Sequence, residues 1–419
     1  MDDMIFNRSA TGTLQHMQQS MESGEAVYGV MKQSALVQLT HFNIITGFVP
    51  CSMHCINLGI AKQFIKYWLD TSNNPYSLNN QDIALIDDIL TRIKVPSKLT
   101  RYSRSIRERS CWKAREFENW VLYYSTIVLL QIPRFKNYVQ HWSYLVKAYF
   151  ILLQVNITQE QILEADHLLK TFVALAEYYY SKSAMTFNVH QLVHLSHSVI
   201  NFGPLWSHSG YCFENGNGKI VERIKAAKGV VHQICRNIGI SRSALILQKY
   251  LDDQDPDSMI LEYVDYLENR ESIKTNKTDT CRYFEKADHA PMNWRRELDL
   301  SDTALIYKKM VKNNCLYRAS NDNQHRSNNS YALLTNNKFV KIHYFIVDRA
   351  KNIEYTICNC VNVTDIFQNH NLNNFHIKKC SLLDDTLHAV NTCDIDKICL
   401  LVQNEQEIYI SPVPNLSSY

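Results

Sequence analysis

The stretch FGPLWSHSGYCFENGNGK, residues 202–219, sets a single carboxylate, Glu214, between a run of aromatic side chains and a run of asparagines and glycines. A carboxylate buried alone is costly unless pairing, protonation or a metal ion compensates it. Two interpretations are open from these residues alone. Glu214 lies at the solvated rim of a hydrophobic turn, as most glutamates are solvated, or it belongs to a functional site. The Asn-Gly-Asn-Gly sequence that follows predicts a break in the chain.

The composition is that of a globular protein. The chain has 419 residues, 46% of them apolar and 20% charged, which favours two or three domains with a sizeable core. A formal net charge of +3 is too small to indicate a polyanionic partner by itself. Twelve scattered cysteines and no visible signal peptide indicate free thiols in a reducing compartment. The longest apolar runs are far shorter than a membrane helix, so we expect a soluble intracellular protein without a membrane partner.

Hydrophobic periodicity predicts an α+β chain that is mainly helical. Thr158 and Gln161 form a capping box that opens a helix running to about residue 180. Further helices are expected at residues 53–69, 80–93, 112–130, 138–153, 188–200 and 220–238. From about residue 330, β-branched and aromatic runs between Asn-rich turns predict five or six strands. The expected parts are a poorly ordered segment (1–35), a helical region (36–250), a helical connector (251–325) and a small β-rich domain (326–419).

Cys51 and His54 are three residues apart at a predicted helix start, a spacing that allows both to bind one zinc ion. A complete site needs four ligands, and no second close pair is evident. The alternative is a thiol and an imidazole that find partners locally.

His190, His194 and His197 share one predicted helix face, and His208 follows downstream. The spacing of the first two matches the helical zinc pair of metalloproteases, but QLV lies between them without the general-base glutamate. The pattern therefore favours half-buried histidines packed against other helices.

A basic segment, residues 92–115, carries nine cations and a single acid, Glu108. Its cations are Arg92, Lys94, Lys98, Arg101, Arg104, Arg107, Arg109, Lys113 and Arg115. Such a cluster can neutralise phosphates, and Tyr102 and Trp112 could stack on bases. The alternative is a solvated connection whose charges meet acids on other helices. The DNA-binding candidates are Arg101, Arg104, Arg107, Arg109, Trp112 and Lys113.

Five blocks in order over residues about 29–240 carry a resemblance to a known family. They are VMKQSALVQLTHFNI, VPCSMHCINLGIAKQFIKYW, SRSIRERSCWKAREFENWVLYY, MTFNVHQLVHLSHSV and FGPLWSHSGYCFENGNGKI. Together they resemble the later part of the CACTA (En/Spm-type) DNA transposases of animals. RSNNSYALL and YISPVPN resemble the C-terminal region of the same proteins.

The resemblance implies a ribonuclease-H-like catalytic core interrupted by a large helical insertion. In that family two aspartates and a glutamate hold two Mg²⁺ or Mn²⁺ ions for DNA cleavage and strand transfer. Glu214 matches the third acid. Cys51 and His54 match a short signature at the start of the insertion, which argues against zinc at either motif. The implied partners are DNA and other transposase-like chains, and the implied location is the nucleus.

The chain also departs from the family. The two family aspartates lie upstream of the Cys51 block, where only Asp2 and Asp3 stand in a weakly patterned start, and Asn43 replaces a common Asp. Mg²⁺ is held weakly by one protein ligand, so Glu214 would hold a metal only with partner acids supplied.

We therefore expect a truncated or host-adopted transposase remnant that binds DNA, has no cofactor as it stands and is inactive alone. The helices that flank Glu214 should lack the ribonuclease-H-like sheet on which the resemblance implies they pack. The alternatives are a protein-interaction or structural module, or an intact transposase whose sequence is N-terminally short.

Overall fold

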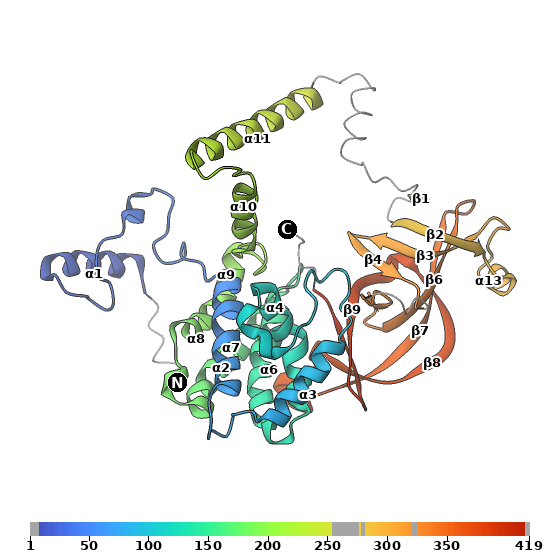
Figure 1. Cartoon of the computed structure of the whole chain (residues 1–419), viewed down its shortest axis with the longest axis horizontal. Coiled ribbons are helices and arrows are strands. Elements are labelled where there is room, and N and C mark those ends of the chain that lie inside the picture. Colours follow the sequence, from blue (N-terminus) through green and yellow to red (C-terminus); the bar gives the residue numbers. More distant parts are fainter. Residues whose placement is uncertain (1–7, 254–275, 278–280, 321–325, 415–419) are drawn as a thin grey trace.

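The computed structural model describes residues 8–253, 276–277, 281–320 and 326–414. Helices occupy the first of these ranges and an antiparallel sheet occupies the others (Figure 1). The expected α+β class, with a helical N-terminal part and a C-terminal sheet, is confirmed. In the described ranges, no helix has the length and apolarity needed to cross a membrane.

The helical part begins with a short arm that was expected to be poorly ordered. The arm contains α1 (Ala10–Ser23), so that expectation is wrong for these residues. Ser9 caps the helix by accepting the Gly12 N–H at 3.0 Å. Met17 on α1 packs with Val30 and Ile44 in a small cluster separate from the main core.

The helical body follows the predicted helices closely. Its elements are η2 (Ala35–Gln38), η3 (Met53–Ile60), α2 (Ala61–Leu69), α3 (Asn80–Arg92), η4 (Ile106–Cys111), α4 (Ala114–Asn119), η5 (Trp120–Tyr124), α5 (Ser125–Leu130), η6 (Pro133–Phe135), α6 (Lys136–Leu152), α7 (Gln159–Tyr180), η7 (Lys182–Ala184), α8 (Phe187–Gln191), η8 (Leu192–His194) and α9 (Leu195–Phe202). The predicted capping box is confirmed: Thr158 accepts the Gln161 N–H at 3.3 Å, and the Gln161 amide accepts the Thr158 N–H at 2.9 Å.

Aromatic side chains fill the centre of this body. Phe64 on α2 lies 5.5 Å from Trp142, 5.4 Å from Phe172 and 4.9 Å from Tyr180, measured between ring centroids. The indole N–H of Trp68 donates to the Tyr180 hydroxyl at 3.0 Å. Edge-on and tilted ring pairs of this kind add to the free energy gained from burial alone. They fix α2, α6 and α7 against one another.

Two segments of the body, η3 and η5, are π-helices. π-Helical turns are rare and occur often at functional sites. One of them, η3, packs against α4, and α4 leads directly into the other, η5.

The last helices of this part are α10 (Tyr211–Glu222) and α11 (Val230–Asp253), which extend away from the body (Figure 1). The predicted break at Asn215–Gly218 is wrong, because these residues continue α10. Each interior glycine costs only about 1 kcal/mol, which weakens a helix without forbidding it. The helix predicted over 220–238 is likewise interrupted, since α10 ends at Glu222 and α11 starts at Val230.

The strands form one antiparallel sheet that closes on itself. They are β1 (Asn276–Lys277), β2 (Cys281–His289), β3 (Leu305–Lys312), β4 (Cys315–Arg318), β5 (Tyr331–Leu334), β6 (Phe339–Asp348), β7 (Ile353–Asp365), β8 (Lys378–Asn391), β9 (Ile395–Gln403) and β10 (Ile408–Pro412), with short helices α13 (Met292–Glu297), η9 (His370–Leu372) and η10 (Thr392–Asp394) between some of them. Strands β6, β5, β9, β10, β8 and β7 pair in that order, and β7 pairs back with β6. These six strands match the predicted number after residue 330.

The prediction of a helical connector over residues 251–325 is wrong for those of its residues that the structure describes. Residues 281–318 form β2, β3 and β4, and only α13 is a regular helix there. β3 extends the sheet by pairing with the second half of β6, with Tyr307 opposite Phe345. Charged residues on β2 and β3, such as Lys286 and Lys309, hide the strand alternation in the sequence. Residues 254–275 lie outside the described ranges.

The helical body and the sheet share one core. The imidazole of His376, just before β8, stacks on Phe150 of α6 at 3.8 Å and contacts the Leu122 carbonyl at 2.9 Å. The buried ammonium of Lys147 donates to the Asn371 and Asn373 carbonyls at 3.2 and 2.7 Å. Ring stacking and hydrogen bonds to backbone carbonyls thus link the helical body to the segment that precedes β8.

Candidate functional site

Glu214 lies in the first turn of α10 and is exposed to solvent. Among the described residues, no ion pair or side-chain hydrogen bond to its carboxylate is found. Those residues also contain no group of three or more His, Cys, Asp or Glu side chains able to hold a metal ion. A Mg²⁺ or Mn²⁺ site needs several carboxylates, so the residues present do not fit the two-metal centre that the resemblance implies.

The Cys51 and His54 pair lies directly against the start of the Glu214 helix. The Cys51 thiol accepts the Gly210 N–H at 3.0 Å and lies 3.3 Å from Nδ1 of His54. A Cβ atom at Gly210 would come within 3.1 Å of the His54 ring and 3.2 Å of the Cys51 sulfur. The pair therefore has local partners, as one of the two interpretations expected, and its geometry joins η3 to α10.

A closed hydrogen-bond ring lies behind this contact, and the sequence did not predict it. The Asn57 amide donates to the hydroxyls of Tyr149 and Tyr211, each at 3.1 Å. Those hydroxyls donate to the two carboxylate oxygens of Glu118, at 3.2 and 3.4 Å. Arg115 donates to Glu118 at 2.6 Å and covers the Tyr211 ring at 3.7 Å. Four separate elements, η3, α4, α6 and α10, thus meet at one carboxylate.

Burial keeps the two phenols of the ring in their protonated form. The Glu118 side chain is 2% exposed and Asn57 is fully buried. Desolvation first, and the Glu118 charge second, raise the pKa of Tyr149 and of Tyr211 far above the usual value. The two phenols therefore stay protonated and act as donors to Glu118. Removal of the carboxylate charge would leave Arg115 without its buried partner.

His190, His194 and His197 are exposed and His208 is half-buried, so the prediction of half-buried histidines packed against other helices is wrong for the first three. His190 and His194 rings lie 5.2 Å apart, and His208 lies 3.4 Å from the Ser198 hydroxyl. Desolvation, followed by the neighbouring His190 and His197, lowers the pKa of His194.

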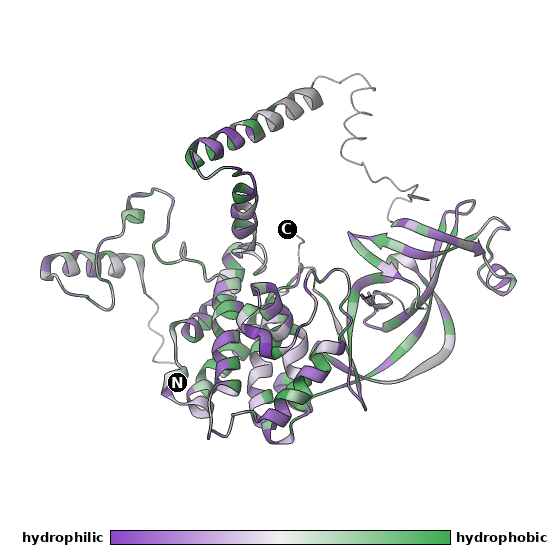
Figure 2. Cartoon of the chain, in the orientation of Figure 1, coloured by the Kyte–Doolittle hydropathy of each residue, from purple (hydrophilic) through white to green (hydrophobic). Residues whose placement is uncertain are grey.

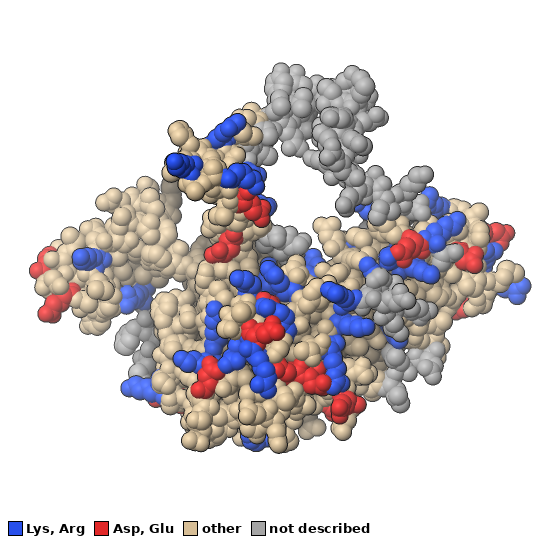
Figure 3. All heavy atoms as spheres, viewed as in Figure 1, with Lys and Arg blue, Asp and Glu red and all other residues tan. Residues whose placement is uncertain are grey.

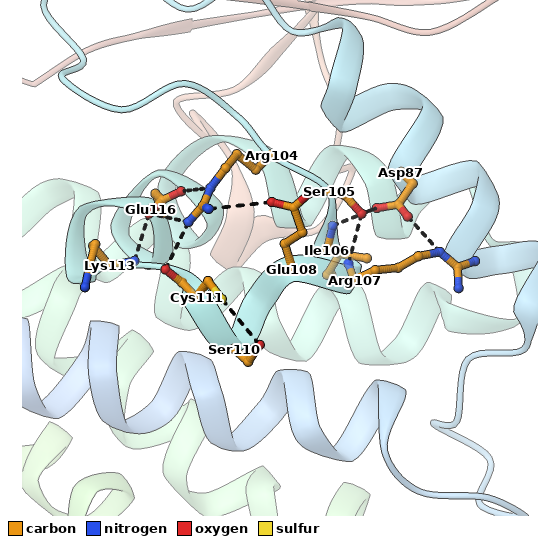
Figure 4. A network of polar contacts seen from close by, with 10 residues as sticks. All are labelled: Asp87, Arg104, Ser105, Ile106, Arg107, Glu108, Ser110, Cys111, Lys113 and Glu116. Carbon is orange, nitrogen blue, oxygen red and sulfur yellow. Dashed lines mark hydrogen bonds and ion pairs between the residues drawn. The ribbon is translucent and has the colours of Figure 1, made fainter.

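Five of the nine cations in the basic segment are paired with acids. Arg104 makes a bidentate pair with Glu116 at 2.6 and 3.0 Å. Arg107 donates to Asp87 at 3.0 Å, and Asp87 also accepts from Ser105 and the Ile106 N–H (Figure 4). The other pairs are Arg92 with Asp88, Arg109 with Asp70 and Arg115 with Glu118. The interpretation that these charges meet acids outside their own helix holds for Arg104, Arg107 and Arg109. Arg92 and Arg115 instead pair with acids one turn away on the same helix.

The remaining cations of the segment make no ion pair with another described residue. Lys94, Arg101 and Lys113 are exposed and Lys98 is half-buried. Trp112 is 7% exposed and packs on Phe117 at 5.4 Å, so it is not available to stack on a base as expected. Tyr102, at 56% exposure, is available. Figure 3 shows acidic and basic side chains intermixed over the helical body.

The fold and site define an α+β protein with a helical body, a closed antiparallel sheet and a projecting pair of helices. No family model, curated protein or solved structure matches the chain.

Proposed function

We propose that this chain is a transposase-derived protein that binds DNA through phosphate contacts and does not cleave DNA alone. One observation carries the proposal. Residues from three of the five sequence blocks that resemble CACTA transposases meet in the ring around Glu118: Asn57, Arg115 with Glu118 itself, and Tyr211. Motifs that lie more than 150 residues apart in the sequence thus form one unit beside Glu214, as parts of one ancestral site would.

The exposure of apolar side chains on α10 and α11 supports a partial ribonuclease-H-like core. No residue of α10 is buried, and apolar side chains such as Phe213, Val221 and Val231 are 71%, 64% and 74% exposed (Figure 2). Within residues 8–253 the chain forms no strand on which they could pack. Helices that once covered a catalytic sheet would have this character. The lone Glu214 is then a third acid without partners.

The DNA-binding role depends on cations that have no acid partner. Four cations can each bind a phosphate, and so release a counterion condensed on the DNA, without first breaking a protein ion pair. They are Lys94, Lys98, Arg101 and Lys113. Arg104 and Arg107 cannot do so, because their guanidinium groups hold Glu116 and Asp87. The role also requires the protein to be nuclear.

The test is duplex binding by the full chain, measured by fluorescence anisotropy over a salt series. Replacement of Lys94, Lys98, Arg101 and Lys113 by Gln should weaken binding and flatten the salt dependence by about 0.9 per lost contact. A control that replaces four exposed cations of the sheet region, Lys286, Arg296, Lys338 and Arg349, removes the same charge. Absent or salt-insensitive binding, or equal losses in both variants, would contradict the proposal.

The exposed apolar side chains of α10 and α11 favour a second candidate, a protein-interaction module. Its partner should then be recovered in pull-downs after nuclease treatment, and Phe213→Ser should abolish the recovery.

A further inference from the structure

The bend between α10 and α11 is the most basic part of the projecting helices. Residues 219–236, the basic elbow, contain Lys219, Arg223, Lys225, Lys228 and Arg236 against a single acid, Glu222. All of these side chains are exposed, and Figure 3 shows the basic atoms gathered where α10 meets α11. The elbow did not stand out in the sequence because its net charge is smaller than that of the basic segment.

Side-chain hydrogen bonds from α11 hold the backbone of the elbow in a defined turn. The Gln233 side-chain oxygen accepts the backbone N–H groups of Lys225 and Ala226 at 2.8 and 3.2 Å. Its amide nitrogen donates to the carbonyls of Ala226 and Lys228 at 2.8 and 2.9 Å. Asn237 donates to the Arg223 carbonyl at 3.1 Å. Two side chains from α11 thus fix the turn, so its cations are presented on an ordered backbone and lose less entropy on binding.

The elbow differs from the basic segment in how its charges are used. Lys219, Lys228 and Arg236 make no ion pair within the described residues, and Lys225 donates only to the Glu222 carbonyl, at 2.7 Å. Five cations of the basic segment, in contrast, already hold acids. An incoming anion therefore meets less competition at the elbow than at most of the basic segment.

The composition of the elbow limits the classes of anionic partner that it can bind. Residues 219–239 contain no Phe, Tyr, Trp or Leu. Single-stranded nucleic acid is typically held by aromatic stacking, and surface-bound helices insert Trp, Phe or Leu into the membrane. Neither device is present within residues 219–239, where the most exposed apolar side chains are the short ones of Val221 and Val231. The elbow itself therefore offers a partner mainly contacts between its cations and a regular array of phosphates.

We propose that the basic elbow binds the phosphate backbone of a nucleic-acid duplex, without sequence preference. The inference rests on the proposed DNA-binding function and assigns its main contact to a surface outside the basic segment. The elbow projects from the body on α10, so it can reach a duplex without rearrangement of the core (Figure 1).

The experiment measures anisotropy of a fluorescent 20-base-pair duplex with the full chain, from about 50 to 200 mM salt. The elbow variant replaces Lys219, Lys225, Lys228 and Arg236 by Gln, and a second variant replaces the same lysines by Arg with Arg236 kept. The control is the sheet variant with Lys286, Arg296, Lys338 and Arg349 replaced. Circular dichroism and thermal unfolding confirm that each variant is folded.

The elbow variant should lose duplex affinity on the order of tenfold or more, with a shallower salt slope, while the arginine variant and the control keep it. Wild-type binding that the elbow variant retains in full would overturn the inference and leave DNA binding intact. A wild-type chain that binds no duplex would overturn both. Elbow-dependent binding to vesicles containing phosphatidylserine, without duplex binding, would also overturn the inference by identifying a lipid surface as the partner.

Discussion

The thiol of Cys51 accepts the backbone N–H of Gly210 at 3.0 Å, which joins the segment just before η3 to the start of α10. The Gly210 carbonyl in turn accepts the Glu214 N–H at 3.0 Å and closes the first turn of the helix. The direction in which α10 leaves the body is therefore set by a glycine between a thiol and an imidazole. Beyond this turn, the helix has no buried residue to guide it.

Gly59 in η3 should not tolerate a side chain. A Cβ atom there would lie 2.5 Å from the Asn188 amide nitrogen and 3.0 Å from the His54 carbonyl oxygen, and the backbone oxygen cannot move freely. Gly59→Ala is expected to lower the free energy of unfolding by about 1–3 kcal/mol, measured by urea denaturation.

The matched control is Gly216→Ala in α10, where a Cβ meets nothing within 4 Å. Alanine there should stabilise the helix by about 0.5–1 kcal/mol and slow hydrogen exchange of its amides. Equal effects at the two glycines would mean that the packing around η3 is described wrongly.

Loss of charge should destabilise the protein at Glu118 and have little effect at Glu214. Glu118→Gln leaves Arg115 without its buried partner and weakens both tyrosine hydrogen bonds, so we expect a loss of about 3 kcal/mol in unfolding free energy. Glu214→Gln removes an exposed, unpaired charge and should change it by less than about 0.5 kcal/mol. A Glu118→Gln variant as stable as the wild type would show that the ring is not a stabilising unit.

Two buried histidines should make the protein sensitive to mild acid. Desolvation lowers the pKa of His141 to about 4 and of His376 to about 3. The unfolded chain takes up these protons near pH 6.5, so stability is complete above that pH and falls as the pH decreases toward the folded pKa values. Each histidine contributes a slope of about 1.4 kcal/mol per pH unit in that window.

His376→Gln tests this directly, because the amide can still donate to the Leu122 carbonyl but does not titrate. Between pH 7 and pH 4.5, the unfolding free energy of the variant should fall less steeply than that of the wild type. The difference in slope should correspond to about one proton fewer taken up on unfolding. Parallel curves for the two proteins would refute the assignment.

The helical body and the closed sheet should unfold together. His376, Lys147 and the shared apolar core cross the boundary between them. Calorimetry is expected to show one main transition, with equal calorimetric and van't Hoff enthalpies. Two well-separated transitions would mean that the parts fold independently.

Local patterns predicted most of the helical body. The capping box at Thr158 and the apolar spacing of residues 53–69 depend on side chains close in the sequence, and both are confirmed. The strands over 281–318 were missed because charged residues interrupt their alternation. The continuous α10 was missed because its two interior glycines predicted a stop, although each costs a helix only about 1 kcal/mol.

The candidate site was predictable only in part. The sequence pointed to Glu214, Cys51 and His54, but nothing local indicated that the last two contact Gly210 from 159 and 156 residues away. The ring around Glu118 draws on four elements and has no sequence signature. The pairing of Arg104 with Glu116 depends on the fold of η4 against α4, so counting cations overstated the charge available to a ligand.

The most direct test of the central claim, that Glu214 is a third acid without its partners, is a DNA cleavage and strand-transfer assay on the full chain with Mg²⁺ or Mn²⁺. We expect no metal-dependent activity, with the wild type and Glu214→Gln giving the same background. Activity in the wild type that Glu214→Gln abolishes would contradict it.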